Sequence, residues 1–291
     1  LRYEEIVAVV RAAAELGISK IRLTGGEPLV RLGIVDLVRE LAAVPGIADL
    51  AMTTNGTLLA RYAADLAEAG LRRVNISLDT LQPARFRAIT RRGDLRDTLA
   101  GIDAANSAGL TPVKINTVVM RGVNDDEVVS LASKTVTDGW NLRFIEWMPV
   151  GGDALVHDDW RERVVTAAEI RARVEAELGP LVPARDLVGA GPARTFRLAD
   201  AGTTAGTLGF ISAISEHFCD SCNRLRLTAN GKLRPCLLSD YEIDLLDALR
   251  GSPETGKLQD LIRQAIQAKP QGHRLARGQR AQARVMAQIG G

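Results

Sequence analysis

Apolar side chains recur along residues 4–148 with two alternating periods. Spacings of three and four residues, which place apolar groups on one side of a helix, predict helices over residues 4–16, around 34–44, over 58–69, before 109 and between 125 and 139. Between them, short runs of alternating polarity predict strands over residues 20–24, 50–54, 74–79, 113–120 and 142–148. Strands that alternate with helices predict βα units and a parallel sheet with right-handed crossovers.

Polar residues occupy one alternating face of these predicted strands, namely Arg22, Thr24, Thr53, Asn55, Asn75, Ser77, Asp79, Lys114 and Asn116. An ordinary parallel barrel packs its centre with branched apolar side chains instead. We therefore expect an α/β fold, a partial (β/α)6-type TIM-like barrel, whose inner face lines a wet chamber for a charged ligand. No predicted strand precedes the first helix, so we expect a first βα unit that is truncated.

The alternation stops after Met148, which predicts two regions, residues 1–150 and residues 151–291. In the second region, the capping-box spacing of Thr166 and Glu169 predicts a helix that ends at Gly179. Short strands are expected at 195–198 and 208–211, and a further helix at about 254–269. The tail after residue 270 is expected to be extended.

Composition and charge exclude several classes of protein. Hydrophobic residues make up 46% of the chain and charged residues 25%, which is ordinary for a globular protein with a real core. The net charge of +2 is too balanced for nonspecific binding to nucleic acid or to an anionic membrane, and no apolar run approaches the roughly 18 residues of a membrane span. The odd number of cysteines, 3, favours reduced thiols in a cytoplasmic protein over a disulfide framework.

All the cysteines of the chain are brought together by a predicted hairpin. Cys219 and Cys222 form a Cys-x2-Cys pair, and Asn230-Gly231 predicts a type I′ turn that folds Cys236 back toward them. Three interpretations remain open on spacing: a structural zinc site completed by His217, a 4Fe–4S cluster with one open iron, or three thiols without a ligand.

Two further features suit an anionic ligand. The segment 24–28 (TGGEP) follows a predicted strand and precedes a helix, where backbone N–H groups can approach a ligand and Glu27 could accept from an amine. It lacks the Gly-Lys-Ser/Thr ending of a P-loop. Arg224 and Arg226 alternate on the strand that leaves the cysteine pair, so one face offers guanidinium groups for phosphate or carboxylate.

Several segments together resemble one family. They are residues 21–28 (IRLTGGEP), 53–56 (TTNG), 75–79 (NISLD), 114–117 (KINT) and 143–149 (RFIEWMP). With Cys-x2-Cys-x13-Cys, the Asn-Arg-Leu-Arg that follows its second cysteine, and the terminal Gly-Gly, they are similar to the radical SAM GTP 3′,8-cyclases, also called molybdenum cofactor biosynthesis protein A.

The resemblance implies a lyase reaction and a set of residues for it. In the family, a first 4Fe–4S cluster reduces S-adenosylmethionine (SAM) to a 5′-deoxyadenosyl radical, which abstracts the C3′ hydrogen of GTP so that the sugar closes onto C8. By position, the implied SAM contacts are Gly26, Ser77 and Met148. The implied GTP contacts are Arg22, Thr53, Lys114, Arg224, Leu225 and Arg226. Cys219, Cys222 and Cys236 are the implied ligands of a second, substrate-binding 4Fe–4S cluster, and Arg224, Arg226, Gly290 and Gly291 the implied catalytic residues.

The family's first cluster needs a Cys-x3-Cys-x2-Cys segment that this sequence does not contain. We therefore expect that the chain as given does not cleave SAM and that only a full-length parent carries the first cluster. The resemblance also implies an external electron donor, product transfer to the downstream molybdopterin-precursor synthase, and a homodimer. Two alternatives stay open: a non-catalytic, single-cluster GTP-binding protein, and a zinc-stabilised α/β protein of unrelated activity.

Overall fold

The computed structural model describes residues 1–150, 160–184, 191–202, 205–251, 255–273, 275, 281 and 283–289. Helices and strands alternate through the first of these ranges, as the apolar periodicity predicts. Their order is α1 (Tyr3–Glu15), β1 (Lys20–Leu23), α2 (Ile34–Ala42), β2 (Asp49–Thr54), α3 (Leu59–Glu68), β3 (Arg73–Ser77), α4 (Pro83–Thr90), α5 (Leu95–Ser107), β4 (Lys114–Val119), α6 (Val128–Thr137) and β5 (Asn141–Glu146). The helical stretch predicted before residue 109 is thus two helices, because Gly93 and the Asp94 cap separate α4 from α5.

The remaining elements are shorter. They are α7 (Ala167–Leu178), β6 (Leu181–Pro183), β7 (Arg194–Leu198), β8 (Thr207–Ile211), β9 (Arg226–Leu227), β10 (Lys232–Arg234), β11 (Ile243–Asp244), α8 (Leu246–Arg250) and α9 (Thr255–Gln267). The capping box predicted for α7 is present, with Thr166 accepting from the backbone of Glu169. In the tail, where an extended chain was predicted, Met286–Gln288 form a 3₁₀ turn.

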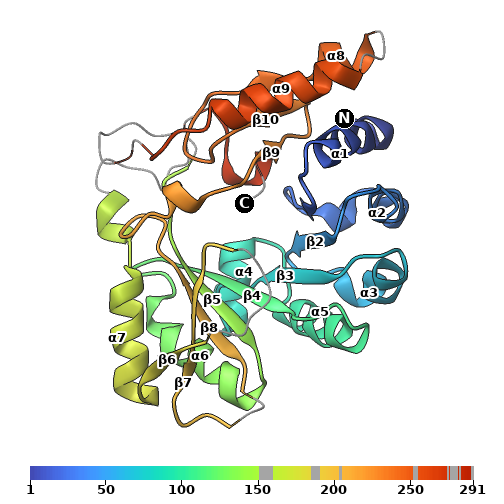
Figure 1. Ribbon diagram of the computed structural model, residues 1–291. Helices are drawn as coiled ribbons and strands as arrows, with labels where there is room; N and C mark the ends of the chain where they lie inside the picture. The colour runs from blue at the N-terminus through green and yellow to red at the C-terminus, as the bar shows by residue number, and fades with distance from the viewer. Residues whose placement is uncertain are drawn as a thin grey trace.

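One sheet organises the described part of the molecule. Its strand order is β1-β2-β3-β4-β5-β8-β7-β6. Strands β1 to β5 and β8 pair in parallel, whereas β7 and β6 are antiparallel additions at the edge. This confirms the predicted partial barrel (Figure 1). Strand β8 belongs to the second predicted region, so the sheet itself crosses the boundary at residue 150, and the division into two domains stays a prediction.

The strand register places polar residues side by side on one face of the sheet. One row runs Thr53, Asn75, Lys114, Asn141 and Thr207, across β2, β3, β4, β5 and β8. Successive side chains on a strand point to opposite faces, so this row and the rows two residues away share the inner face. The opposite face carries apolar residues such as Leu50, Ile76 and Leu142, which pack into the main core with the helices.

A second, smaller core joins the end of the chain to its beginning. Val9, Ala12 and Ala13 of α1 pack with Leu233 of β10 and Ile262 of α9. In Figure 1 the orange and red C-terminal elements therefore lie beside the blue helix α1. Because α1 leads directly into β1, an edge strand of the sheet, this packing brings the β9–β10 hairpin next to the inner face.

The predicted hairpin forms, but the predicted type I′ turn is wrong. Gly231 has a φ of 81°, whereas Asn230 is not among the described residues with positive φ, as a type I′ turn would require. The loop is one residue longer, with the Thr228 N–H donating to the Lys232 carbonyl at 2.8 Å. The Thr228 hydroxyl bonds to Asn230 Oδ1 at 2.8 Å, and this local bond stabilises the longer loop.

Helix α5 packs closely against the loop that follows β2, and Gly101 makes this approach possible. A Cβ at Gly101 would lie 2.3 Å from the carbonyl oxygen of Gly56. We expect Gly101→Ala to lower the free energy of unfolding by about 1–3 kcal/mol, as overpacking does. Gly256→Ala is the matched control, because that position in α9 has nothing within 4 Å of its Cβ, and it should stabilise by about 1 kcal/mol. Urea denaturation of both variants checks this, and equal effects would contradict the close packing.

Candidate functional site

Basic side chains gather on the inner face of the sheet. Arg22 lies on β1, Arg73 on β3, Lys114 on β4 and Arg143 on β5. Neighbouring positive charges lower the pKa of Arg22, of Lys114 and of Arg143, in each case after burial, the larger cause. Arg73 and Arg143 lie two residues from Asn75 and Asn141 of the polar row, so these cations share the inner face of the sheet. The wet chamber that the polar strand faces predict stays a prediction.

Lys114 is the most enclosed of these cations, with only 4% of its surface exposed. Burial lowers its pKa to about 8, and the positive charges of Arg143 and Arg73 act in the same direction. An ammonium group in these surroundings is stabilised when an anion binds beside it. The position is therefore suited to a phosphate group.

One carboxylate, that of Asp49, lies among the cations. It accepts two hydrogen bonds from Arg73, one of them from Nε at 3.0 Å. The hydrogen bond from Arg73 lowers the pKa of Asp49 despite its partial burial. This fork holds Arg73 against β2. Arg73 thus contributes charge to the chamber from a fixed position.

Arg143 was not among the predicted ligand contacts, and the fold makes room for it. A Cβ at Gly209 of β8 would lie 3.0 Å from Cγ of Arg143, so glycine there lets the long side chain cross the inner face. Burial lowers the pKa of Arg143 to about 10, and Arg22 contributes. The sequence contains a signal for Arg143, because it lies two residues after Asn141 and so on the same polar face of β5. Arg73 lies two residues before Asn75 on β3 in the same way.

The glycine loop after β1 is organised by Glu27. Its carboxylate accepts from the backbone of Leu29 at 3.0 Å, from the Thr54 hydroxyl at 2.8 Å and from the backbone of Asn55 at 2.7 Å. The Glu27 carboxylate, which we expect to accept a hydrogen bond from a ligand amine, thus also holds the loop after β1 against the loop after β2. Gly26 has nothing within 4 Å of its Cβ position, so its backbone faces open space that a ligand can enter.

The predicted SAM contacts all lie at the same edge of the sheet. Gly26 follows β1, Ser77 ends β3 and Met148 follows β5, and the C-terminal ends of parallel strands are where barrels hold their ligands. Asp79, two residues beyond Ser77, accepts from the backbone of Val118 at 2.8 Å. Burial raises the pKa of Asp79 to about 6. A ligand at this edge therefore meets both hydroxyl and carboxyl groups.

The cysteine hairpin brings the three thiols together. Cys219, Cys222 and Cys236 are free and each is partly buried. Burial raises the pKa of Cys219, and the charges of the other two thiols act in the same direction. Burial also raises the pKa of Cys222, but hydrogen bonds from Arg224 outweigh it and lower the value to about 7. The thiols therefore affect one another, and one of them is poised to ionise.

The donor set fits an iron–sulfur cluster, because thiolates are the ligands of such clusters and three of them leave one iron of a 4Fe–4S cluster open. In the described ranges no group of three or more His, Cys, Asp or Glu side chains could hold a metal ion. Both ring nitrogens of His273 are buried without a hydrogen-bond partner, and the ring lies 5.1 Å from that of His217, edge to face. Buried polar atoms of this kind are uncommon in folded proteins, and a bound group or an ordered water beside them would satisfy them.

Two arginines, Arg224 and Arg226, lie on the hairpin that follows the cysteine pair. Burial and Arg73 lower the pKa of Arg22 on β1, and Arg224 of the hairpin acts in the same direction. Arg224 also stacks on the Phe218 ring at 5.0 Å. Burial, with Arg224, lowers the pKa of Arg226 to about 10. Arg22 nevertheless keeps exposed surface, as expected of a side chain that lines a solvent-filled chamber.

Comparisons with known proteins agree with this geometry. The Radical SAM superfamily matches residues 1–134 and the Molybdenum Cofactor Synthesis C family matches residues 140–275. A GTP 3′,8-cyclase of Pelotomaculum thermopropionicum is 53% identical over 100% of this chain and 87% of its own length. One from Moorella thermoacetica is 51% identical with the same coverage. The chain belongs to the GTP 3′,8-cyclase family.

A solved structure supports the radical SAM fold of this family member. Streptococcus suis SuiB, crystallised with S-adenosylmethionine, has a TM-score of 0.58 and 14% sequence identity. The similarity covers 89% of this chain, which spans 61% of the SuiB chain. No helix in the described ranges is long and apolar enough to cross a membrane.

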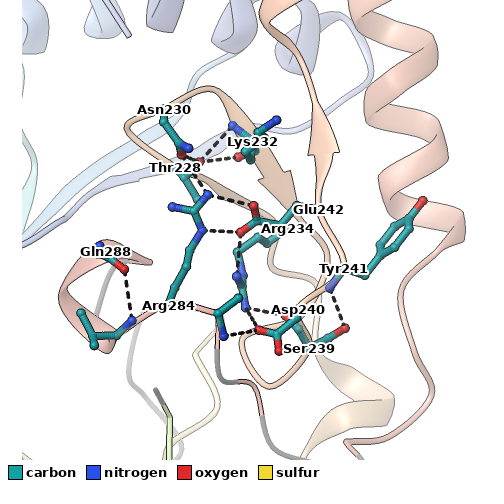
Figure 2. Close-up of polar contacts among 12 residues, drawn as sticks. Thr228, Asn230, Lys232, Arg234, Ser239, Asp240, Tyr241, Glu242, Arg284 and Gln288 are labelled. Atoms are coloured by element: carbon teal, nitrogen blue, oxygen red, sulfur yellow. Dashed lines mark hydrogen bonds and ion pairs between the residues drawn. The ribbon is translucent and has the colours of Figure 1, made fainter. Parts of the chain in front are cut away.

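The tail of this GTP 3′,8-cyclase family member is attached to the cysteine hairpin by an ion-pair network (Figure 2). Glu242 accepts from Arg234 Nη1 at 2.7 Å, and from both Nε and Nη2 of Arg284, the latter at 2.8 Å. Arg284 also donates to Asn230 in the hairpin loop at 3.0 Å. Gly290 and Gly291, predicted to be catalytic, lie outside the described residues. The network positions the tail up to Ile289, which is 3% exposed.

Proposed function

We propose that the chain is a radical SAM GTP 3′,8-cyclase of molybdenum cofactor biosynthesis, an enzyme that converts GTP to (8S)-3′,8-cyclo-7,8-dihydroguanosine 5′-triphosphate with a first cluster that only its full-length parent carries. One observation carries the proposal: Lys114, on the polar face of the sheet, is 4% exposed and lies in register with Asn75 and Asn141, and Arg73 and Arg143 share that face. Cations on this face and thiols on a neighbouring hairpin suit a triphosphate that is held beside an iron–sulfur cluster.

In this proposal the triphosphate is held by cations from both halves of the chain. Lys114 provides a buried point charge, while Arg22, Arg224 and Arg226 offer planar guanidinium groups that can bind phosphate through two hydrogen bonds each. Thr53, which accepts from Asn75 Nδ2 at 3.3 Å, and the backbone of Leu225 complete the proposed GTP contacts. The mutual repulsion of the cations is relieved when GTP enters, and this favours binding of a highly charged nucleotide over a neutral nucleoside.

Cys219, Cys222 and Cys236 would hold a 4Fe–4S cluster, and Gly26, Ser77 and Met148 would contact SAM. When bound, these cofactors supply the radical chemistry that GTP cyclisation requires. The residues of the chain itself bind and orient the substrate. Arg224 and Arg226, which closely follow the Cys222 ligand, fix the distance between the proposed cluster and the phosphates. Gly290 and Gly291, beyond the anchored tail, are proposed to complete the site.

The remaining partners are also proposals. A first 4Fe–4S cluster in the full-length parent, an external electron donor and product transfer to a downstream molybdopterin-precursor synthase follow from the family's reaction. A homodimer and a cytoplasmic location are proposed on the same ground. Anaerobic size-exclusion chromatography with light scattering tests the homodimer.

Metal analysis tests the proposed function. After anaerobic reconstitution we expect about four irons and four sulfides per chain, and an electron paramagnetic resonance spectrum that changes when GTP is added. A Cys236→Ser variant is the control and should hold much less iron. Stoichiometric zinc that resists replacement by iron would contradict the cluster and favour the zinc-stabilised alternative. If the spectrum of the cluster does not change when GTP is added, the proposed contact between the cluster and GTP is wrong.

A further inference from the structure

Lys269 joins the two chain segments that carry the cysteines. It follows helix α9, and its Nζ donates to the carbonyl oxygens of Arg224 and Pro235, both at 2.9 Å. Arg224 comes two residues after Cys222, and Pro235 immediately precedes Cys236. A single ammonium group therefore bridges the backbone beside two of the three thiols.

His273, four residues further on, reaches the chain next to the third thiol, because its ring lies 5.1 Å from that of His217, two residues before Cys219. Its imidazole ring, whose nitrogens are buried without a hydrogen-bond partner, stacks edge to face on His217. The segment 269–273 thus contacts the surroundings of Cys219, Cys222 and Cys236, although it lies more than 30 residues away from all of them in the sequence.

An ordinary capping role does not account for Lys269. A lysine near a helix C-terminus usually binds the last carbonyl groups of its own helix. The carbonyl groups that Lys269 binds are 45 and 34 residues away in the sequence. Both of its hydrogen bonds are thus directed at the backbone of the cysteine site.

We propose that residues 269–273 form a clasp that holds the three-cysteine site in shape and stabilises the negative charge of the 4Fe–4S cluster bound there. The inference rests on the cluster assigned under the proposed function. Reduction adds an electron to the cluster, so a nearby ammonium group and N–H donors favour its reduced form. Groups that support metal ligands in this way typically change metal affinity by about 10–100-fold when they are removed.

Three substitutions of Lys269 separate the bridge from the charge. Lys269→Met removes both, Lys269→Gln keeps two N–H donors without charge, and Lys269→Arg keeps charge and donors. Lys257→Met is the matched control, because Lys257 is exposed on α9. Each reconstituted protein is challenged with an iron chelator, and its cluster potential is measured by an anaerobic redox titration followed by electron paramagnetic resonance. Circular dichroism confirms that each variant is folded.

We expect Lys269→Met to lose iron about 10–100-fold faster than the wild type. The ratio of reduced to oxidised cluster should fall about tenfold at a given potential, which corresponds to a shift of about 59 mV to more negative values. Lys269→Arg should match the wild type in both the rate of iron loss and the cluster potential. Lys269→Gln should lose iron more slowly than Lys269→Met, but its potential should still differ from that of the wild type. Iron retention and potential equal to those of Lys257→Met would overturn the clasp. A wild-type chain that assembles no cluster would instead overturn the proposed function, and the clasp with it.

Discussion

Replacing Lys114 with methionine is expected to weaken GTP binding about 10–100-fold at pH 7. The ammonium group belongs to a residue that is 4% exposed, and three arginines, Arg143, Arg73 and Arg22, contribute to its lowered pKa. A charge-assisted hydrogen bond from such a group contributes about 1.5–3 kcal/mol to binding. Isothermal titration calorimetry measures the loss of affinity.

The pH dependence follows from the pKa of Lys114, which is about 8 in the folded protein against an ordinary value of 10.5. Between these values the unfolded chain keeps a proton that the folded chain has released. Stability of the ligand-free wild type should therefore rise from about pH 8 to 10.5, while its affinity for GTP falls over the same range. The Lys114→Met variant should lack both changes up to about pH 9, below the pKa of about 10 of Arg143 and Arg226.

Lys114→Arg provides the control, because an arginine keeps its proton to a higher pH than a lysine at the same position. Its affinity for GTP should stay nearly constant between about pH 7 and pH 9, below the pKa of about 10 that burial gives Arg143 and Arg226. If Lys114→Met binds GTP as tightly as the wild type, Lys114 does not contact the nucleotide. The proposed arrangement of the triphosphate would then have to be revised.

Replacing Glu242 with glutamine is expected to lower the free energy of unfolding by about 3–5 kcal/mol. Glu242 bonds to both Arg234 and Arg284, and the Arg234 side chain is 0% exposed. Removal of the carboxylate charge leaves Arg234 as a buried cation with much weaker compensation, and breaking a buried pair is costly for that reason. Figure 2 shows how the two arginines converge on this one carboxylate. Urea denaturation at pH 7 measures the loss.

Lowering the pH should weaken the same interaction of Glu242 with Arg234 and Arg284, and so lower the free energy of unfolding. Hydrogen bonds from Arg284 lower the pKa of Glu242 below its ordinary value, so its contribution is present above that ordinary value and is lost as the pH falls through the lowered pKa. The Glu242→Gln variant should lack this part of the acid-induced loss. Asp247→Asn, on α8 and outside the network, is the control. Equal stability of the two variants would show that the network attaches the tail without stabilising the fold.

Most regular elements could be predicted from the sequence. Helix α2 lies where Ile34, Leu37 and Leu41 recur at helical spacing, and all three are buried. Strand β8 was predicted as a short strand, but its role as the sixth parallel strand was not. Its pairing with β5 depends on residues more than 60 positions apart, and a pattern within one segment contains no information about its partner.

The candidate site also contains residues that the sequence indicates and residues that it does not. The cysteine spacing and the polar faces of the strands are enough to single out Cys219, Cys222, Cys236 and Lys114 as candidates for chemistry. They do not single out the arginines of β3 and β5, although each alternates with an asparagine on the same strand face. Lys269 gives no signal at all, because a lysine after a helix is an ordinary surface residue until its neighbours are known.

The sequence by itself determined the alternation of helices and strands, the ends of most of them, and the residue types available for chemistry. These properties are local: they depend on apolar spacing, capping groups and turn residues within a few positions of one another. Only the tertiary structure decided that Lys269 bridges the cysteine hairpin and that Arg284 attaches the tail to Glu242. Each of these contacts joins distant parts of the chain and arises from the packing of two hydrophobic cores, which brings the polar groups between them together.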